Sequence, residues 1–314
     1  MHTLVTGGAG FIGTALVERL LAEGHSVDVA DNLSSGSLWH LADARASAGR
    51  NFAFHQVDVR APEITELIVR RRPEVVWHLA AHPEGGSAAS EAHTDVVGAL
   101  AVLEGVRAGE TRKLVVASSA TVYGEGGDRA LSEAHARRPL SAAAVGKHAV
   151  DAYLAVYAEL EAVRFSSLVI ANAYGPRTGR GVVGRWAEAL ASGRPCTVFG
   201  DGSQVRDFVY IDDVVDALAR AADRADGMIV NVGTGQPTSL LELHAAMVEA
   251  AGRSVDDDRG PPLGLHHAAA RPGEPHSVVL DPSRAADVLE WQPWTALGDG
   301  LDAVFAAYRK RSSP

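Results

Sequence analysis

Thr3-Leu4-Val5-Thr6-Gly7-Gly8-Ala9-Gly10-Phe11-Ile12-Gly13 is the stretch that decides the fold of this chain. An apolar strand runs into glycines at positions 7, 10 and 13, and a helical run from Thr14 to Glu23 follows at once. A pyrophosphate reaches the N-terminus of a helix only where no Cβ shields the backbone N–H groups. Gly7 therefore permits the turn, Gly10 permits close approach of the phosphates, and Gly13 lets the helix pack on the strand.

The second strand carries the next signal. It runs from Ser26 to Ala30 and ends in Asp31, which lies 18 residues beyond Gly13 (31 minus 13). A carboxylate at this point can accept hydrogen bonds from both ribose hydroxyls of an adenosine and repels a 2′-phosphate, so NAD is preferred to NADP. Asn32 follows directly, and the alternative is that Asp31 and Asn32 only cap the next loop.

Strands and helices then alternate as far as residue 170. The third strand, Phe52 to Val57, is followed by Asp58 and Val59, which places a carboxylate where the adenine amino group would lie. Val75 to Ala81 is an apolar run typical of a buried parallel strand, and its His78 is expected to make a core hydrogen bond rather than bind a metal. The alternation predicts a parallel sheet with right-handed crossovers, an α/β Rossmann doubly wound fold. The other segments expected here are Leu38 to Ala48, Ile64 to Arg71, Ser90 to Ala108 and Ala142 to Glu161 as helices, with Lys113 to Ala117 and Arg164 to Ile170 as strands.

The rhythm changes after Asn172. Residues 207–232 look like a return to the first lobe, with strands at Phe208 to Tyr210 and Met228 to Val232. We therefore predict a dinucleotide-binding domain of residues 1–170 plus 207–232. Residues 171–206 plus 233–314 form a smaller, interleaved C-terminal lobe that covers the carboxyl edge of the sheet, where open α/β sheets bind ligands.

Composition limits the functional classes. A net charge of −10 argues against a nucleic-acid surface, and no apolar run is long enough to span a bilayer. The single cysteine, Cys196, excludes an internal disulfide and is expected to be a small buried residue. The first strand begins at residue 2 or 3, so we expect no signal peptide and a cytoplasmic location.

Ordered motifs along nearly the whole chain carry a family resemblance. The chain resembles the extended short-chain dehydrogenase/reductase proteins of the NAD-dependent epimerase/dehydratase family, most closely the UDP-glucose 4-epimerase group. The matching segments are Thr6 to Gly13, His78 to Ala81, Ser118 to Gly124, Asn172 to Arg177, Phe199 to Gly202, Arg206 to Phe208, and Arg271 to Glu274.

The resemblance implies a transient oxidation of a UDP-sugar at C4. Bound NAD accepts a hydride, and a tyrosinate removes the hydroxyl proton. The 4-keto sugar then rotates in the site and is reduced on its other face. Ser119 falls at the position that hydrogen-bonds the reacting oxygen, and Lys147 at the lysine that also holds the nicotinamide ribose. The implied cofactor residues are Gly7, Gly10, Phe11, Ile12, Gly13, Asp31, Asn32, Asp58, Val59, Leu79, Ala80, Ala81, Ala117 and Lys147. The implied substrate residues are His82, Ser119, Ala120, Thr121, Asn172, Arg206 and Arg271.

One catalytic position departs from the family. The tyrosine expected four residues before Lys147 is replaced by Ala143, which offers no acid or base. The substitution is engineered, or a natural enzyme uses another base such as Ser119 through water, His82, Glu84 or Tyr123, or the chain binds its ligands without turnover. Tyr153 and Tyr157 are expected to be packing residues.

Two arginines and two helices complete the expectations. Arg206 and Arg271 match arginines that bind the substrate diphosphate, whereas Asp207, Asp212 and Asp213 are expected to cap the helix that begins there. Ala120 and Thr121 stand where dehydratases carry an Asp-Glu pair, which disfavours dehydration. Family dimers pair through the helices Ser90 to Ala108 and Ala142 to Glu161, so a homodimer is predicted. The alternative functions are a silent NAD and nucleotide-sugar binder, or another NAD-dependent nucleotide-sugar reaction such as decarboxylation or dehydration.

Overall fold

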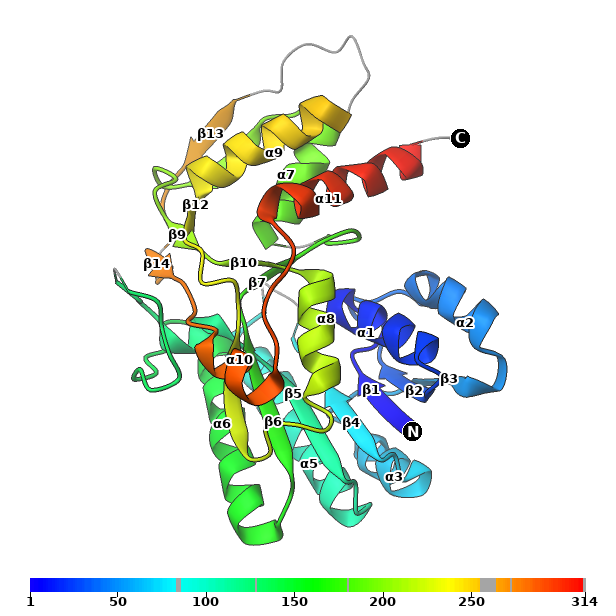
Figure 1. Cartoon of the computed structure of the whole chain (residues 1–314). Coiled ribbons are helices and arrows are strands. Elements are labelled where there is room, and N and C mark those ends of the chain that lie inside the picture. Colours follow the sequence, from blue (N-terminus) through cyan, green and yellow to red (C-terminus); the bar gives the residue numbers. More distant parts are fainter. Residues whose placement is uncertain (83–85, 128, 180, 255–263, 272, 313–314) are drawn as a thin grey trace.

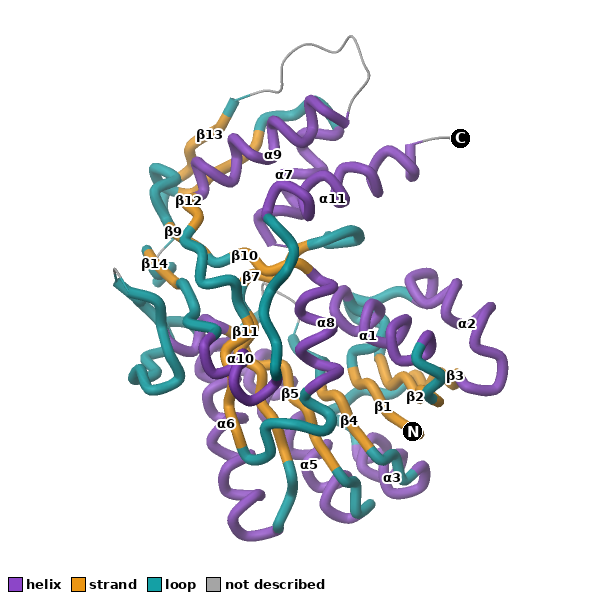
Figure 2. Tube along the Cα trace, viewed as in Figure 1, coloured by secondary structure: helices purple, strands orange, loops and turns teal. Residues whose placement is uncertain are grey.

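A seven-stranded parallel sheet forms the centre of the protein (Figures 1 and 2). A computed structural model describes residues 1–82, 86–127, 129–179, 181–254, 264–271 and 273–312. The strand order is β11-β6-β5-β4-β1-β2-β3, and the order reverses direction between β1 and β4, as in a doubly wound sheet. The predicted fold class is confirmed. The strands are β1 (His2–Thr6), β2 (Ser26–Asp31), β3 (Phe52–Gln56), β4 (Val75–His78), β5 (Lys113–Ser119), β6 (Phe165–Ile170) and β11 (Met228–Val232).

Alternate side chains of these strands pack into two separate hydrophobic cores, one on each face of the sheet. Leu4 and Val76 belong to the core beneath α3 (Pro62–Arg71), α5 (Gly98–Ala108) and α6 (Ala142–Glu161). Val5 and Trp77, one residue further on, belong to the core beneath α1 (Phe11–Ala22), α8 (Ile211–Arg220) and α10 (Ser283–Leu289). Successive strand residues point to opposite faces, so a sheet covered on both sides needs apolar residues at every position.

The second lobe has a hydrophobic core of its own. Trp186, Met247 and Phe305 are buried together, and they come from α7 (Gly181–Ala191), α9 (Leu240–Ser254) and α11 (Leu297–Ser312). These three helices lie above the sheet in Figure 1. The remaining strands are short and form three small sheets outside the main one: β7 (Asn172–Tyr174), β8 (Cys196–Phe199), β9 (Val205–Arg206), β10 (Phe208–Tyr210), β12 (Thr238–Ser239), β13 (Leu265–Ala268) and β14 (Ser277–Val278).

Several elements differ in detail from the expectation. β10 pairs with β7 in a separate two-stranded sheet, and of the returning segment only β11 enters the main sheet. α10 packs on the first-lobe core, although its residues fall in the range predicted for the second lobe. The predicted helix from Ser90 to Ala108 starts earlier, as α4 (Ala88–Ala92), and continues through a π-helical segment (His93–Val97) into α5. The domain boundaries themselves stay a prediction. The remaining α-helix is α2 (Ala42–Ala48).

The structure tests two expectations that came from the composition. Cys196 is fully buried on β8, as predicted, and burial raises the pKa of its thiol to about 11. Within the described residues, no helix is both long and apolar enough to cross a membrane.

A buried carboxylate ties the first three strands together. Asp28 on β2 is 1% exposed and accepts hydrogen bonds from His2 Nε2 (2.7 Å), His55 Nε2 (3.1 Å) and Arg71 Nε (2.7 Å). Burial alone would raise its pKa, but the hydrogen bonds from Arg71, His55 and His2 together lower it. The ionised Asp28 therefore stabilises the native state.

We expect Asp28→Asn to lower the free energy of unfolding by about 2 kcal/mol at pH 7, because solvent-exposed Arg71 loses a charge-assisted hydrogen-bond partner. A carboxylate with a lowered native pKa stabilises above its unfolded pKa of about 4 and loses this contribution as the pH falls. Urea unfolding of both proteins between pH 7 and pH 3 checks this. A difference in stability that stays constant through this range would contradict it.

Candidate functional site

The glycine turn has the geometry expected of a phosphate-binding loop. Gly7 has a positive φ of 69°, and a Cβ there would lie 2.7 Å from the Ala80 backbone N. A Cβ on Gly13 would lie 2.1 Å from the Gly7 carbonyl oxygen, so this close approach of helix and turn requires glycine. A Cβ on Gly10 would meet only the Gly7 oxygen, at 3.2 Å. Gly10 thus presents bare backbone at the beginning of α1, where Phe11 and Ile12 form the first turn.

Asp31 holds the glycine turn in place. It is 8% exposed, and its two carboxylate oxygens accept the Ala9 N–H (2.9 Å) and the Leu33 N–H (2.8 Å). Oδ1 therefore caps the loop that follows β2, as the alternative interpretation proposed, and Oδ2 binds the glycine turn. Each carboxylate oxygen can accept a second hydrogen bond, so the contact with ribose hydroxyls stays a prediction.

Asp58 lies beside the same edge and is fully ionised. Arg60 donates to both of its oxygens (2.8 and 2.6 Å), and Asn32 Nδ2 donates to Oδ2 (2.9 Å). The Arg60 hydrogen bond is the main reason that the pKa of Asp58 lies far below its usual range. Val59, the next residue, is buried. An ionised acceptor suits an amino group, as predicted for the adenine.

The end of β4 reaches the glycine turn through backbone contacts. The Leu79 N–H donates to the Thr6 carbonyl oxygen (3.1 Å), and the Ala80 N–H lies 3.4 Å from Thr6 Oγ1. His78 Nδ1 contacts the same hydroxyl at 2.8 Å, so the predicted core hydrogen bond is confirmed. Burial, aided by the charge of Lys147, lowers the pKa of His78 to about 3.

Beyond the exposed Ala81, the His82 N–H donates to Asp95 Oδ1 (2.8 Å), which fixes the backbone at His82. Glu84, one of the suggested bases, lies outside the described residues.

Ser119 ends β5 and begins a short 3₁₀ turn. Its Oγ accepts from the Thr121 N–H (3.3 Å) and from Thr121 Oγ1 (2.9 Å). Thr121 is exposed and Ala120 is buried beneath the turn, while Ala117 pairs with β6 inside the strand. The Ser119 hydroxyl thus stands at the carboxyl edge with its orientation set by its neighbour.

Helix α6 presents Ala143 and Lys147 on one face. Ser141 caps the helix by accepting the Ala144 N–H (3.2 Å). Lys147 is half-buried, and no hydrogen bond or ion pair within the described residues occupies its ammonium. Lys147 lies near the start of α6, which follows the carboxyl end of β5, and its charge contributes to the lowered pKa of His78 at the end of β4. Ala143 lies one turn earlier and is also half-buried.

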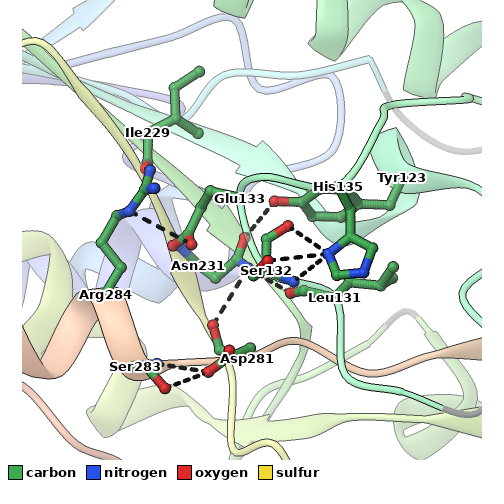
Figure 3. A network of polar contacts seen from close by, with 10 residues as sticks. All are labelled: Tyr123, Leu131, Ser132, Glu133, His135, Ile229, Asn231, Asp281, Ser283 and Arg284. Carbon is green, nitrogen blue, oxygen red and sulfur yellow. Dashed lines mark hydrogen bonds and ion pairs between the residues drawn. The ribbon is translucent and has the colours of Figure 1, made fainter.

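No tyrosine takes the place that Ala143 leaves. Tyr123, a suggested base, is 2% exposed and donates to Asn231 Oδ1 (2.8 Å) inside the polar network of Figure 3. Burial raises its pKa to about 12, which disfavours a role as a base. Tyr157 donates to Glu104 and Tyr153 is exposed, further along α6. Tyr174, Tyr210 and Tyr308 belong to the second lobe and its junction.

The two predicted diphosphate arginines lie in the second lobe. Arg206 on β9 is 9% exposed, and its guanidinium donates to Glu274 Oε1 (3.1 Å) and to the His276 carbonyl oxygen (3.1 Å). Arg271 lies over the Phe199 ring, with Cζ 3.8 Å from the centroid. Glu274 and His276, which bind Arg206, follow Arg271 closely in the chain.

Asn172 at the start of β7 is exposed, and its backbone N–H donates to the Asp207 carbonyl oxygen (2.9 Å). The expectation for Asp207 is wrong: its carboxylate accepts from Thr234 and Gly235 rather than capping α8. Asp207 instead joins β9 to the loop after β11, beside Arg206.

Sequence reasoning did not single out Glu125. Its carboxylate accepts the His276 N–H (2.6 Å) and the Ser277 N–H (2.9 Å), so it links the loop after Tyr123 to the segment that holds Arg206. In the sequence, only its position two residues after Tyr123 indicates a place near the site, and that indication is weak.

A hollow of about 520 Å³ lies between α1 and the start of α8, and its walls include Phe11, Glu18, Arg177 and Tyr210. Arg177 forms a bidentate ion pair with Glu18 (2.8 and 2.7 Å), which joins the second lobe to α1. Within the described residues, no group of three or more His, Cys, Asp or Glu side chains could hold a metal ion.

The fold and this edge define a dinucleotide-binding α/β protein, and comparisons with known proteins give its family. The sequence model of the NAD dependent epimerase/dehydratase family matches residues 3–233. A UDP-glucose 4-epimerase of Mycolicibacterium smegmatis is 40% identical over 322 aligned positions, covering 99% of this chain and 100% of that protein. The chain therefore belongs to the NAD-dependent epimerase/dehydratase family, and the predicted family and its NAD dependence are confirmed.

Solved structures agree with this assignment. The UDP-glucose 4-epimerase of Thermotoga maritima, solved with UDP-glucose, is 32% identical with a TM-score of 0.89 and covers 100% of both chains. That of Thermus thermophilus, solved with NAD, is 34% identical with a TM-score of 0.87, covering 98% of this chain and 99% of the other. The glycine turn of this chain fits such a dinucleotide, because glycine at positions 7, 10 and 13 leaves the backbone at the beginning of α1 free of side chains.

We expect Gly10→Ala and Gly13→Ala to separate binding from folding. A Gly10 Cβ would contact only the Gly7 carbonyl oxygen, at 3.2 Å, so this variant should lose less Tm than Gly13→Ala but bind NAD at least about tenfold more weakly. Gly13→Ala should lower the Tm as well, because α1 must move away from β1. Calorimetric titration with NAD and thermal unfolding measure the two effects. Wild-type NAD affinity in Gly10→Ala would contradict the assigned role.

Proposed function

We propose that this protein is an NAD-dependent UDP-sugar 4-epimerase in which the proton acceptor is not a tyrosine. The observation that carries the proposal is the combination of the Gly7 to Gly13 turn with Ser119 and Lys147 at one edge of the sheet. UDP-sugar epimerases that cover nearly the whole chain support the reaction class. A UDP-glucuronate 4-epimerase of Thermodesulfobacterium geofontis is 29% identical to this chain, so relatives act on different UDP-sugars and the proposal names only the class.

The substrate diphosphate is proposed to bind Arg206 and Arg271. Guanidinium groups match phosphate oxygens geometrically, and Arg206 is largely desolvated, which strengthens its interactions. Burial lowers the pKa of Arg206, although Glu274 opposes this effect. Asn172 exposes a neutral amide at the same boundary between lobes and is proposed to contact the diphosphate or sugar.

At the reacting carbon, this chain supplies Ser119 and Lys147. NAD, when bound, supplies a reversible hydride acceptor. The Ser119 hydroxyl is proposed to hydrogen-bond the C4 oxygen, and the Lys147 ammonium to stabilise negative charge on that oxygen as its proton leaves. Dehydration is disfavoured because Ala120 and Thr121 carry no acid or base for eliminating water.

The proton of the C4 hydroxyl needs an acceptor other than Ala143, which has no acid or base. Tyr123 is buried and protonated, which leaves His82 or a water held by Ser119 as acceptors among the described candidates. Ala143 also favours a second function, in which the protein holds NAD and a UDP-sugar without turnover.

We expect Ala143→Tyr to raise 4-epimerase activity by at least about 100-fold, because a positioned acid–base group contributes rate factors of this order. Each protein is incubated separately with UDP-glucose, UDP-N-acetylglucosamine and UDP-glucuronate, and the sugar products are followed by NMR. Ala143→Phe, which adds the ring without the hydroxyl, is the matched control.

The outcomes separate the two functions. Measurable turnover by the natural sequence, lost in Ser119→Ala, supports the epimerase with a different acceptor. Activity that appears only in Ala143→Tyr assigns the natural sequence to the binding function. No turnover by either protein, together with no UDP-sugar binding, would contradict both.

A homodimer is part of the proposal, and the outer face of α6 supports it. Val145, Tyr153, Val156 and Leu160 are exposed by 53%, 41%, 49% and 73%. They lie on the side of the helix opposite to its buried residues, and the exposed Val97 stands on the adjoining π-helical segment. Large apolar side chains gathered on neighbouring helices favour packing against a second copy in a four-helix arrangement.

We expect Val156→Glu to convert the dimer into a monomer at micromolar concentration, because the carboxylate would be buried without a partner. Light scattering measures the mass. Val69→Glu, at an exposed position on α3, is the control and should leave the dimer intact. A monomeric wild-type protein at this concentration would count against the dimer.

A further inference from the structure

The strongest unassigned polar cluster surrounds Asp151 on α6. This carboxylate is 2% exposed and lies one turn beyond Lys147 on the same helix. Its Oδ1 accepts the Ser167 hydroxyl (2.5 Å), and its Oδ2 accepts Ser118 Oγ (3.1 Å) and Arg137 Nη1 (2.6 Å). One buried group thus joins α6 to β5, to β6 and to the loop that precedes the helix.

We infer that Asp151 is a positioning residue that sets Lys147 and Ser119 in their working arrangement. This inference rests on the proposed function of the same site.

The first step is mechanical. The carboxylate is fixed at both oxygens by buried hydroxyls, and its charge is compensated by Arg137, so it is not free to rotate. A helix held at Asp151 is held one turn away at Lys147, since the α-helix is stiff over this distance. α6 runs beside β5 and β6 in Figure 1, which is where these contacts form.

The second step concerns β5. Ser118 and Ser119 are consecutive, so their side chains point in different directions from the end of one strand. Ser118 donates a hydrogen bond to Asp151 on the α6 side. The Ser119 hydroxyl stays at the carboxyl edge, where it binds Thr121. The Asp151 contact therefore fixes the relative position of the two groups proposed to act on the sugar.

The third step concerns charge. Arg137 is largely buried and also lies over the Tyr123 ring, with Cζ 5.9 Å from the centroid. A buried carboxylate without a partner would destabilise the fold, and the ion pair with Arg137 compensates its charge. Because Arg137 precedes α6, the pair also attaches the loop between Tyr123 and Ser141 to the site.

The chain offers a matched pair of substitutions for the test. Ser166 and Ser167 are neighbours on β6 and are both fully buried. Ser167→Ala removes the bond to Asp151. Ser166→Ala removes bonds to the Arg224 and Ala225 carbonyl oxygens, at the opposite end of the lobe from Lys147. Both variants delete one buried hydroxyl, so they should cost similar stability.

The three lysines of the sequence, at positions 113, 147 and 310, make the readout simple. The full-length protein is labelled with ¹³Cε-lysine, and Lys147→Arg assigns the Lys147 NMR signal. Ser167→Ala and Asp151→Asn are expected to shift the Lys147 signal. Ser166→Ala is expected to shift the Lys113 signal instead, because Lys113 Nζ donates to the same Arg224 carbonyl oxygen.

NAD affinity is the second readout, measured by calorimetry. We expect Ser167→Ala to weaken NAD binding by about tenfold and Ser166→Ala to leave it unchanged, with the same loss of Tm in both. A Lys147 signal that responds equally to both serine variants, or to neither, would overturn the inference. If the wild-type protein fails to bind NAD, the proposed function fails, and the lysine signals still decide the role of Asp151.

Discussion

The close approach of α1 to the turn after β1 is the constraint on which the rest of the structure depends. Gly13 lies so near the Gly7 carbonyl oxygen that no side chain fits between them, and the Ala80 backbone closes the turn from the β4 side. Asp31 then holds the turn from β2 by accepting the Ala9 N–H. Three neighbouring strands thus converge on one short segment. The exposed N-terminus of α1 is a consequence of this packing, and so is its ability to bind a pyrophosphate.

The helix α6 plays the corresponding part on the other half of the sheet. Its inner face binds β5 and β6 through Asp151, its first turns carry Ala143 and Lys147, and its outer face is apolar and exposed. A single helix therefore combines attachment to the sheet, the proposed chemistry and the proposed subunit contact. Ala143 favours the helical conformation, since alanine is the best helix former, and it supplies no acid or base for the proposed chemistry.

The second lobe depends on segments that are distant in sequence. Arg206 is held by Glu274 and by the His276 carbonyl oxygen, Glu125 binds the same segment, and Asp207 joins β9 to the loop after β11. These contacts hold Arg206 between the segments that follow β5, β11 and Arg271. A bound diphosphate would be expected to compete with Glu274 for Arg206, since both are anions.

The sequence by itself determined the parallel sheet, the glycine turn and the cofactor class. Each depends on local pattern, such as glycine spacing or an apolar run, and the fold and family predictions were confirmed. Tertiary structure alone decided that Tyr123 is buried against Asn231, that β10 pairs with β7, and that Asp207 binds Thr234 rather than capping α8. Those features arise between residues tens of positions apart, and neither propensity nor spacing encodes which distant partner a buried polar group will find.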